Sequence, residues 1–527
     1  MKFKSPTSFV WILTGIWARG MTLLVWQSIA LCNGHLIYAI DDPYIHLSVA
    51  ENILQGGYGV NLGEYSAPSS SIIYPFILAG TEWIKLGSAG PLVINLLAMG
   101  GAVFMLGKIL EKHVFPSISY ITKSSLDYTY FLVVGVLLCL VMNAWGLVLI
   151  GMEHSLQIFL CLIIFHSFLE VVVNNKAPPV SLYLALIILP LIRFEGLALS
   201  ILGIIFLIYL GHKRVAVISA FVVALLLVLW ATFMDSKNLP FFPSSVQLKS
   251  EIVADLKHGT ISSLIDLILK NFSNSLPKPH VITFCLILLI LSWLVYREFK
   301  NSRRMLAYLS LGILLAGVAH AALGRFGWGV RYESYATILI WLMIIYLLRD
   351  FIKNKYIKIA LIFVLIDAAR YHSTWTVTRM SALATRNIYE QQYQMHRFVV
   401  DFWKRPVAVN DLGWVSYKND FYVLDLWGLG SEDVRLSKMS GTYNSSKINE
   451  LIAKNNISFI MIYDEWFNGV IPGNWEKVAT LETSCISATY GLVQFYIPNK
   501  KNINEAKKLL ADFSLDLPAG AKIIIEP

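Results

Sequence analysis

The sequence predicts a polytopic α-helical membrane protein that ends in a soluble α/β domain. Of its 527 residues, 56% are hydrophobic and only 15% are charged. Soluble domains carry about 25% charged residues, whereas a charged side chain at the centre of a membrane helix costs about 2.5 kcal/mol or more. Long apolar runs alternate with short polar loops, while a transmembrane barrel would show alternating segments of about ten residues. The spanning elements are therefore expected to be helices.

A membrane span needs about 20 predominantly apolar residues, and this rule places eleven helices along the chain. They are expected near residues 20–39, 91–110, 127–149, 152–173, 180–194, 196–210, 215–233, 281–296, 305–323, 335–348 and 358–370. Residues 9–17 are either an interfacial lead-in or the start of a longer first helix that would include Arg19. The apolar stretch 72–86 contains Glu82 and Lys85 and is interpreted as a helix in the outer interface.

Basic residues gather on alternate loops. With a cytoplasmic N-terminus, the inner loops hold most of the loop lysines and arginines, among them Lys112, Lys176, Arg297 and Arg349. This distribution agrees with the positive-inside rule and accounts for much of the net charge of +9. Nucleic-acid binding is therefore not needed to explain the basic composition. An odd number of spans then places the chain after the last helix on the outer side.

The predicted division is a membrane domain over residues 1–370, with a first outer loop at 40–90, and a soluble domain over 371–527. Within the soluble domain, residues 374–404 follow a helix-like pattern. Short runs typical of strands occur at 407–409, 421–424, 457–463 and 491–497. These runs imply a small α/β domain.

Two adjacent carboxylates, Asp41 and Asp42, follow the first predicted span. An acidic turn at a helix end would explain them simply. The functional interpretation is that one of them acts as a general base, because burial beside a second acid raises a carboxylate pKa. The other would orient the acceptor or bind a cation, so a divalent cation at this pair is an open alternative and no cofactor is required. An amphipathic helix at 44–55 then carries His46 and Glu51, which are expected to support the substrate.

Polar residues also cluster at the outer ends of later helices. These clusters are Glu153 with His154, Arg193 with Glu195, Arg331 with Tyr332 and Glu333, and the loop residue Lys249. Simple structural explanations exist for three of them: an acid favoured at a helix start for Glu153, a tight turn for Arg193 with Glu195, and a solvated loop residue for Lys249. Ionisable residues at membrane depth nevertheless indicate function, and arginines suit phosphate groups. The pattern predicts a lipid-phosphate-sugar transferase, in which cations hold the phosphate leaving group and a carboxylate deprotonates the acceptor hydroxyl.

The order and spacing of these elements resemble polyprenyl-phosphate-sugar-dependent glycosyltransferases of the GT-C fold. The closest resemblance is to the bacterial branch that contains the terminal arabinofuranosyltransferases of mycobacterial cell walls. The matching elements are residues 41–45 with 50–52, 151–154, 193–196 and 331–333, and the C-terminal segments 410–413 and 423–430.

The resemblance implies inverting transfer of a sugar from a polyprenyl phosphate to a glycan, lipid or surface-protein acceptor. Arabinofuranose is the sugar of this branch, but residues 239–244 depart from the family's pattern before Lys249 and leave the sugar open. The base maps onto Asp41 or Asp42, and the donor-phosphate contacts map onto Arg331, Arg193 and Lys249. The resemblance also implies a multi-pass protein of the bacterial inner membrane, with a cytoplasmic N-terminus and a periplasmic C-terminal domain.

Two other classes stay open. A polymerase or ligase that uses a lipid-diphosphate-linked oligosaccharide also needs outer arginines, but it usually lacks an acidic pair directly after the first helix. A lipid-linked sugar carrier would place ionisable residues in the middle of its helices. In this chain the polar clusters lie at helix ends on one predicted side, which favours the transferase.

Overall fold

A computed structural model describes residues 7–115, 125–244, 247, 261–371 and 374–527. The chain falls into two compact units, each built from three segments. The first, which we call the helical unit, contains Met1–Val25, Leu92–Leu229 and Thr260–Met380. The second, the sheet unit, contains Trp26–Pro91, Trp230–Gly259 and Ser381–Pro527. The predicted first outer loop therefore belongs to the same compact unit as the C-terminal residues.

Seven helices in the described residues are long and apolar enough to cross a membrane, judged by length and composition. They are α1 (Thr7–Leu31), α4 (Gly90–Ile109) with the π-helical turn η2 (Leu110–Val114), α6 (Ser125–Val141) with α7 (Gly146–Ile150), α8 (His154–Asn174), α11 (Lys213–Ser236), α15 (Pro279–Lys300) and α16 (Arg304–Leu323). The remaining predicted spans coincide with shorter helices, namely α9 (Val180–Ile192), α10 (Gly196–Tyr209), α17 (Ser334–Leu348) and α18 (Lys355–Tyr371).

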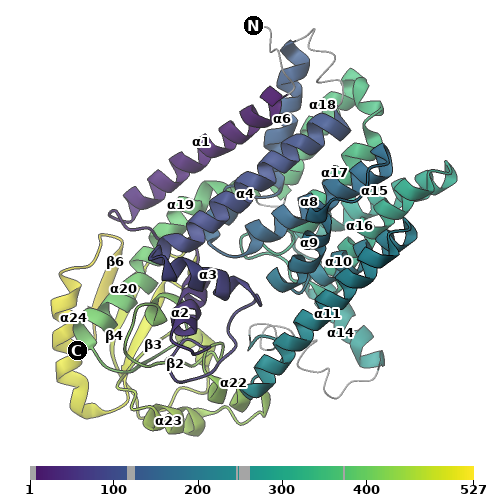
Figure 1. The fold of residues 1–527 in the computed structure, drawn as a ribbon. Coiled ribbons are helices and arrows are strands. Elements are labelled where there is room, and N and C mark those ends of the chain that lie inside the picture. Colours follow the sequence, from purple (N-terminus) through teal and green to yellow (C-terminus); the bar gives the residue numbers. More distant parts are fainter. Residues whose placement is uncertain (1–6, 116–124, 245–246, 248–260, 372–373) are drawn as a thin grey trace. The chain divides into compact units, whose positions relative to one another are not determined.

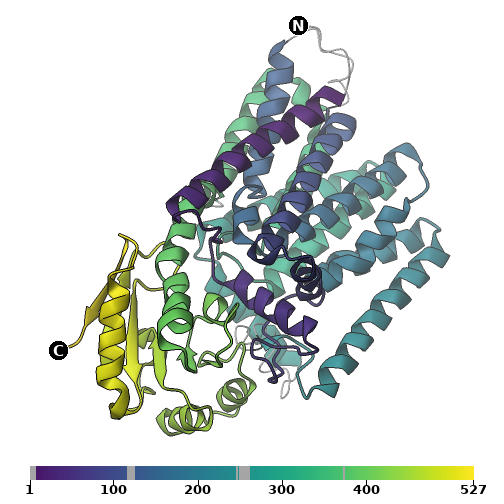
Figure 2. The ribbon, with the colours of Figure 1, turned by 60° about the vertical axis from the view of Figure 1, so that its left-hand side comes forward.

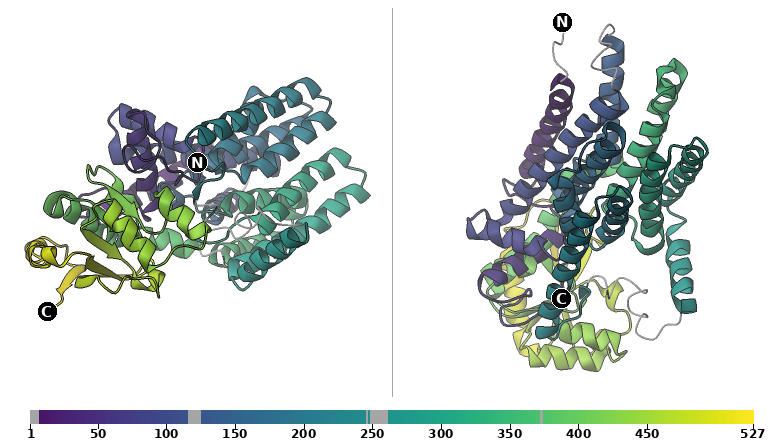
Figure 3. Two further views of the ribbon diagram at one scale, coloured as in Figure 1. Left: turned by 90° about the horizontal axis from the view of Figure 1, so that it is seen from below. Right: turned by 45° about the vertical axis from the view of Figure 1, so that its right-hand side comes forward.

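Within the helical unit, consecutive helices pack against one another. Helices α15, α16 and α17 lie side by side, as do α8, α9 and α10 (Figure 1, Figure 2 and Figure 3). The polytopic helical class predicted from composition is confirmed, because every predicted span coincides with or overlaps an apolar helix. Helix α14 (Ile261–Ser275) has no counterpart among the predicted elements.

The predicted bounds 20–39 of the first span are wrong, whereas the alternative of a longer first helix that includes Arg19 is confirmed. Helix α1 begins at Thr7 and includes Arg19, and it ends near Leu31, well before residue 39. Asn33 and Gly34 have positive φ values of 52° and 88°, and the Gly34 N–H donates to the carbonyl of Ile29. This left-handed turn is a common way for a helix to end. Arg19 is exposed on the helix surface, where its long side chain can extend toward a polar boundary.

The stretch predicted as an interfacial helix forms α3 (Tyr74–Trp83), which has ten residues. At a rise of about 1.5 Å per residue, such a helix is much too short to cross a bilayer. The short 3-10 turn η1 (Gly87–Ala89) then leads into α4. The length of α3 therefore agrees with leaving it out of the spans.

The sheet unit contains one mixed sheet of six strands in the order β2-β1-β3-β5-β4-β6. The strands are β1 (Val407–Val409), β2 (Val423–Asp425), β3 (Phe459–Ile462), β4 (Glu476–Thr483), β5 (Leu492–Ile497) and β6 (Ala521–Ile525). Strands β2, β1 and β3 are parallel, with Ala408 paired to Leu424 and Ile460, and the other pairs are antiparallel. Three predicted strands are confirmed, β2 begins two residues later than predicted, and β4 and β6 were not predicted.

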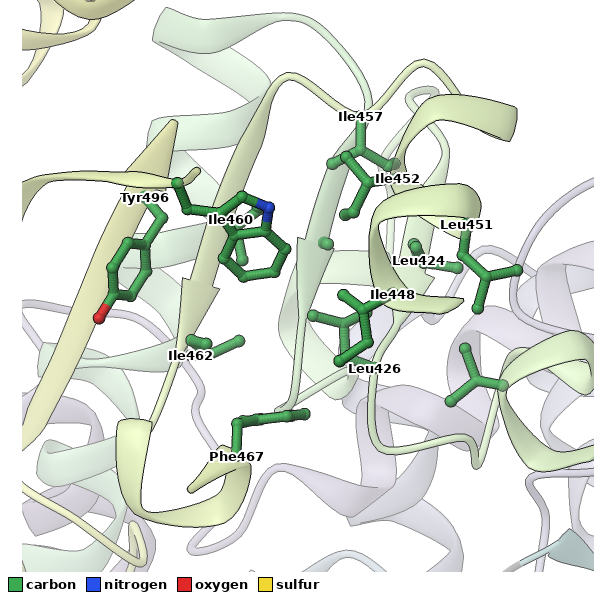
Figure 4. Packing of buried hydrophobic residues seen from close by; sticks show 13 residues of the cluster. Leu424, Leu426, Ile448, Leu451, Ile452, Ile457, Ile460, Ile462, Phe467 and Tyr496 are labelled. Atoms are coloured by element: carbon green, nitrogen blue, oxygen red, sulfur yellow. The ribbon is translucent and has the colours of Figure 1, made fainter. Parts of the chain in front are cut away.

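Both faces of the sheet are covered. On one face, Ile448, Leu451 and Ile452 of α23 (Ser445–Lys454) pack in one core cluster with Ile460 and Ile462 of β3 (Figure 4). On the other face, α24 (Ile503–Ser514) and the π-helical turn η4 (Phe398–Trp403) contribute an aromatic cluster with β3 and β5. Successive side chains of β3 point to opposite faces of the sheet, so this strand contributes to the hydrophobic core on each face.

The remaining described elements are helical. They are α2 (Asp42–Leu54), α19 (Thr374–Glu390), α20 (Gln392–Arg397), α21 (Gly413–Ser416), α22 (Glu432–Met439), and the short turns η3 (Phe351–Lys353), η5 (Asp464–Phe467) and η6 (Lys500–Asn502). The predicted helices at 44–55 and 374–404 are confirmed. Polar residues follow the carboxyl ends of the three parallel strands, which is where open α/β sheets commonly bind ligands.

Candidate functional site

Asp41 links the first loop to the C-terminal part of the sheet unit. It precedes α2, yet its carboxylate does not cap that helix. One oxygen accepts the backbone N–H of Gly413 at 2.6 Å, and the other accepts the N–H of Trp414 at 2.9 Å. These donors open helix α21, so an anion there is held by charge-assisted hydrogen bonds. A cation bound at Asp41 would have to compete with both donors.

Gly413 permits this close approach. A Cβ atom at position 413 would lie 2.1 Å from the carbonyl oxygen of Asp41 and 2.6 Å from its carboxyl carbon. Neither group can move away without breaking the two hydrogen bonds. The glycine is therefore required by packing at this contact.

A third carboxylate, Asp411, lies just after strand β1 and belongs to the same region. Its Oδ2 accepts hydrogen bonds from the Tyr463 hydroxyl at 2.7 Å and from the Gln392 side-chain amide at 2.8 Å. The neighbouring Asn410 accepts the backbone N–H of Tyr463 at 2.8 Å. Asp411 is thus held by groups from α20 and from the end of β3.

The carboxylates influence one another electrostatically. Burial and the charge of Asp411 raise the pKa of Asp41 well above its ordinary value, although two backbone N–H donors oppose the shift. Burial and the charge of Asp42 also raise the pKa of Asp411, whereas the hydrogen bonds from Tyr463 and Gln392 partly oppose this rise. Asp41, Asp42 and Asp411 therefore form one interacting carboxylate group, in which Asp41 and Asp411 retain a proton to higher pH than an isolated aspartate.

Asp42 has a different setting from its neighbour. It is the first residue of α2 and is half-buried. His46 lies one turn later on the same helix face, buried against Tyr74, with its Nδ1 3.1 Å from the Ser69 hydroxyl. The structure therefore brings the predicted residues Asp42 and His46 onto one helix face.

Glu51 lies near the other end of α2. Its Oε2 accepts the backbone N–H of Lys418 at 3.1 Å, which connects the helix to the segment after α21. Burial raises the pKa of Glu51 to about 7, partly opposed by that N–H donor. Glu51 is thus a second connection between the first loop and the C-terminal residues.

In the helical unit, Arg193 is surrounded by the predicted acids. Its Nη1 donates to Glu153 at 2.6 Å, and its Nε and Nη2 donate to the two carboxylate oxygens of Glu195 at 3.2 and 2.9 Å. Arg193 and Glu153 are buried. Arg193 thus has two carboxylate partners, so its positive charge is already compensated within the protein.

Tyr332 collects the other predicted residues of this unit. The guanidinium carbons of Arg193 and Arg331 lie 5.4 and 5.0 Å from its ring centroid, within the cation–π range. Arg331 also donates from Nη2 to the Tyr332 hydroxyl at 3.0 Å, and the ring of His154 lies 5.8 Å away. The structure therefore brings Arg193, Arg331 and His154 together around Tyr332. With Glu153 and Glu195, the partners of Arg193, they form a group that we call the Tyr332 cluster.

The loop before Arg331 has an unusual backbone. Residues 327–330 have four consecutive positive φ values, of 100°, 47°, 74° and 58°. Such a value is a clear outlier for a β-branched residue such as Val330. Asn143, at the break between α6 and α7, donates to the carbonyl of Gly329 at 2.9 Å and holds the loop. Strained backbone of this kind concentrates at functional sites.

Glu333 supports the same loop. Its Oε2 accepts the Gly327 N–H at 3.2 Å, and its Oε1 lies 3.8 Å from Nε2 of His280. Lys249, the remaining predicted phosphate contact, lies outside the described residues. Sequence reasoning gave no role to Asp411 or to Asn143. Their signals were available, since Asp411 follows a strand end and Asn143 interrupts an apolar run.

Comparisons with known proteins cover different parts of the chain. Residues 386–496 match a family described as a domain of unknown function (DUF8728). No curated protein matches the sequence. The apo oligosaccharyltransferase from Archaeoglobus fulgidus is similar at 12% identity and a TM-score of 0.49, over 99% of this chain and 76% of that one. ArnT from Cupriavidus metallidurans, bound to undecaprenyl phosphate, is similar at 10% identity and a TM-score of 0.49, over 92% of this chain and 98% of that one.

Replacing Gly413 with alanine should release the contact with Asp41. The added Cβ would overlap the Asp41 carbonyl, and loss of a hydrogen bond to a charged group costs about 1.5–3 kcal/mol. Hydrogen exchange of the 410–418 amides in the full chain should therefore accelerate by about 10-fold to 100-fold. Gly473→Ala is the matched control, because no heavy atom lies within 4 Å of a Cβ there. Unchanged exchange in Gly413→Ala would contradict this role.

Ionisation of Glu51 should lower stability as the pH rises. Its folded-state pKa of about 7 exceeds the ordinary 4.5, so the folded chain binds this proton more tightly. The stabilisation is complete below about pH 4.5 and is lost as the pH rises through about 7. Glu51→Gln keeps an acceptor for the Lys418 N–H, so its apparent Tm should fall less between about pH 5 and about pH 8 than that of the wild type.

Thermal melting of the full chain in detergent measures this difference. The exposed Glu465→Gln serves as the control and should keep the pH dependence of the wild type. An identical fall in Tm for Glu51→Gln and wild type would show that Glu51 does not titrate in this range.

Proposed function

We propose that the protein is an inverting glycosyltransferase that moves a sugar from a polyprenyl phosphate to a hydroxyl group of a cell-envelope acceptor. The observation that carries the proposal is the carboxylate group at the start of α2. The first-loop acids that resemble those of GT-C enzymes lie beside a third carboxylate, and Asp41 accepts two backbone N–H groups. The Tyr332 cluster, which contains Arg331, agrees with a phosphate-binding role.

In this scheme Asp42 is the general base and Asp41 is a positioning residue. Asp41 already accepts two backbone N–H donors, so taking a proton from a substrate would weaken the contact that orders the loop. Asp42 lies at a helix N-terminus beside that contact. The acceptor oxygen forms a bond to the anomeric carbon while the bond from that carbon to the phosphate oxygen breaks. The acceptor proton passes to Asp42, and polyprenyl phosphate leaves with the electron pair.

Arg331 is the proposed ligand of the leaving phosphate, and Arg193 is a supporting residue. Two glutamates neutralise Arg193, so its charge is already used within the protein. Arg331 lies over the ring of Tyr332 and donates a hydrogen bond to the hydroxyl of the same residue, and both contacts position its guanidinium. A cation held in this way can stabilise the charge that develops on the phosphate.

The proposed setting is the bacterial inner membrane, with the N-terminus in the cytoplasm and the C-terminal domain in the periplasm. The distribution of basic loop residues supports this orientation. The donor is a lipid-linked sugar, and the acceptor is a glycan, a lipid or a surface protein. No step of the scheme uses a cofactor.

The test is a transfer assay with purified full-length protein. Polyprenyl-phosphate arabinofuranose, mannose and glucose are supplied in turn with cell-envelope acceptors, and the released polyprenyl phosphate is measured by mass spectrometry. Release with one of these donors supports the proposal and identifies the sugar. Turnover only with a lipid-diphosphate-linked oligosaccharide, which releases a diphosphate, would favour a polymerase or ligase. Transport without release would favour a carrier.

Asp42→Asn should lower the transfer rate by about 100-fold to 10,000-fold, as expected for loss of a general base. Its stability should change by no more than the loss of one negative charge in the first turn of a helix, about 0.3–1 kcal/mol. Asp41→Asn should lower both activity and Tm, since an amide nitrogen cannot accept the second backbone N–H. The exposed Asp420→Asn is the control. Near-wild-type transfer by Asp42→Asn would sink the base assignment.

Arg331→Ala should raise the KM for the lipid donor by about 10-fold to 100-fold, since a hydrogen bond to a charged group contributes about 1.5–3 kcal/mol. The KM for the acceptor should change little. Steady-state kinetics with each substrate varied in turn separates the two effects. Arg325→Ala removes an exposed arginine of the same loop and is the control. An equal rise in both KM values would count against a phosphate role.

A further inference from the structure

Three side chains that could bind a metal ion lie near the C-terminal end of helix α8, away from Glu153 and the Tyr332 cluster. His166 and Glu170 are four residues apart on α8, so they share one face. His113 comes from the π-helical turn η2, which closes with a hydrogen bond from the Phe115 N–H to the Leu110 carbonyl. Turns of this kind are rare and occur often at functional sites.

The three side chains are close enough to share one ion. One ligand atom of each residue lies within 4.8 Å of the ligand atoms of the other two. Nε2 of His113 is 2.8 Å from Oε1 of Glu170, and the imidazole centroids of His113 and His166 are 5.2 Å apart. His113 and Glu170 are buried. Small side-chain rotations would bring these atoms to the separations of a tetrahedral centre, roughly 3.3 Å for metal–ligand bonds of about 2.0–2.1 Å.

The carboxylate is already held by groups outside this trio. Lys112 and Lys176 place their ammonium nitrogens 2.7 and 2.8 Å from Oε2 of Glu170, and Asn174 donates to Oε1 at 3.1 Å. Hydrogen-bonded outer groups of this kind orient carboxylate ligands in metal sites. The two ammonium charges also repel a cation, so they should limit its affinity.

We propose that His113, His166 and Glu170 form a binding site for a divalent transition-metal ion of the zinc type. Two imidazoles and one carboxylate are ligands that zinc prefers, whereas calcium and magnesium prefer oxygen ligands alone. Three protein ligands leave a fourth position for water. The ion would join the end of α4 to the end of α8.

This site is independent of the proposed transferase chemistry. Glu153 and Glu170 are 17 positions apart in and next to α8, which corresponds to about 25 Å along a helix. The metal site and the Tyr332 cluster therefore lie at different ends of the helical unit. Loss of the ion would empty the metal site but would remove no residue of the Tyr332 cluster.

The test uses purified full-length protein that has been stripped of metal with a chelator. Titration with Co²⁺ should give the visible absorption of a tetrahedral centre at stoichiometric binding, and Zn²⁺ should displace it. His113→Ala and His166→Ala should each weaken binding by more than about 100-fold, since changes to outer-sphere groups alone cost about 10-fold to 100-fold. His212→Ala removes a histidine of the same unit outside the cluster and is the control.

Lys176→Gln tests the charge argument separately. Glutamine keeps a donor for Oε2 of Glu170 but removes a positive charge, so the affinity for Zn²⁺ should rise by about 10-fold. Wild-type protein that gives no tetrahedral Co²⁺ spectrum would overturn the proposal without any variant. Histidine variants that bind Zn²⁺ as tightly as the wild type would overturn it as well.

Discussion

The contact between the Asp41 carboxylate and two backbone N–H groups is the constraint on which the sheet unit's candidate site depends. It joins residues 372 positions apart in the chain. Closing so long a loop costs conformational entropy, and two charge-assisted hydrogen bonds of about 1.5–3 kcal/mol each help to offset that cost. Asp42 and Asp411 are neighbours of this contact in sequence, so their positions follow from it. The hydrogen bonds from the backbone to Asp41 therefore also position Asp42 and Asp411.

The two arginines show how surroundings decide the role of a side chain. Arg193 and Arg331 both lie near the ring of Tyr332, and the sequence resemblance offers both as phosphate contacts, with Arg331 ahead of Arg193. Arg193 is paired with two glutamates in a buried setting, where removing one partner of an ion pair is costly. Its function is then to fix the geometry of the cluster. Arg331 lies directly after a strained loop segment, and strain of that kind is tolerated only where the surrounding structure enforces it.

Much of the helical architecture could be predicted from sequence, because an apolar run long enough to span a membrane usually forms a transmembrane helix. The start of α1 could not, since one arginine in an apolar run fits either a boundary or an exposed helix face. Strand β4 escaped prediction because only Val478, Ala479 and Leu481 of its eight residues are apolar, and Asp411 escaped a role because its partners Gln392 and Tyr463 lie far away in sequence. Tertiary contacts, which no local pattern records, decide these cases.

A base must be ionised to accept a proton, and the carboxylate group offers a physical reason why one member can be. Burial and mutual repulsion raise the pKa values of Asp41 and Asp411, so these two acids retain a proton to higher pH than isolated aspartates. Asp42 lies in the first turn of α2, a position where acidic residues are favoured. Protonation of Asp41 or Asp411 would lower the negative charge around Asp42. The acids around the base would then set its protonation state, and the hydrogen bonds that position them would also tune the chemistry.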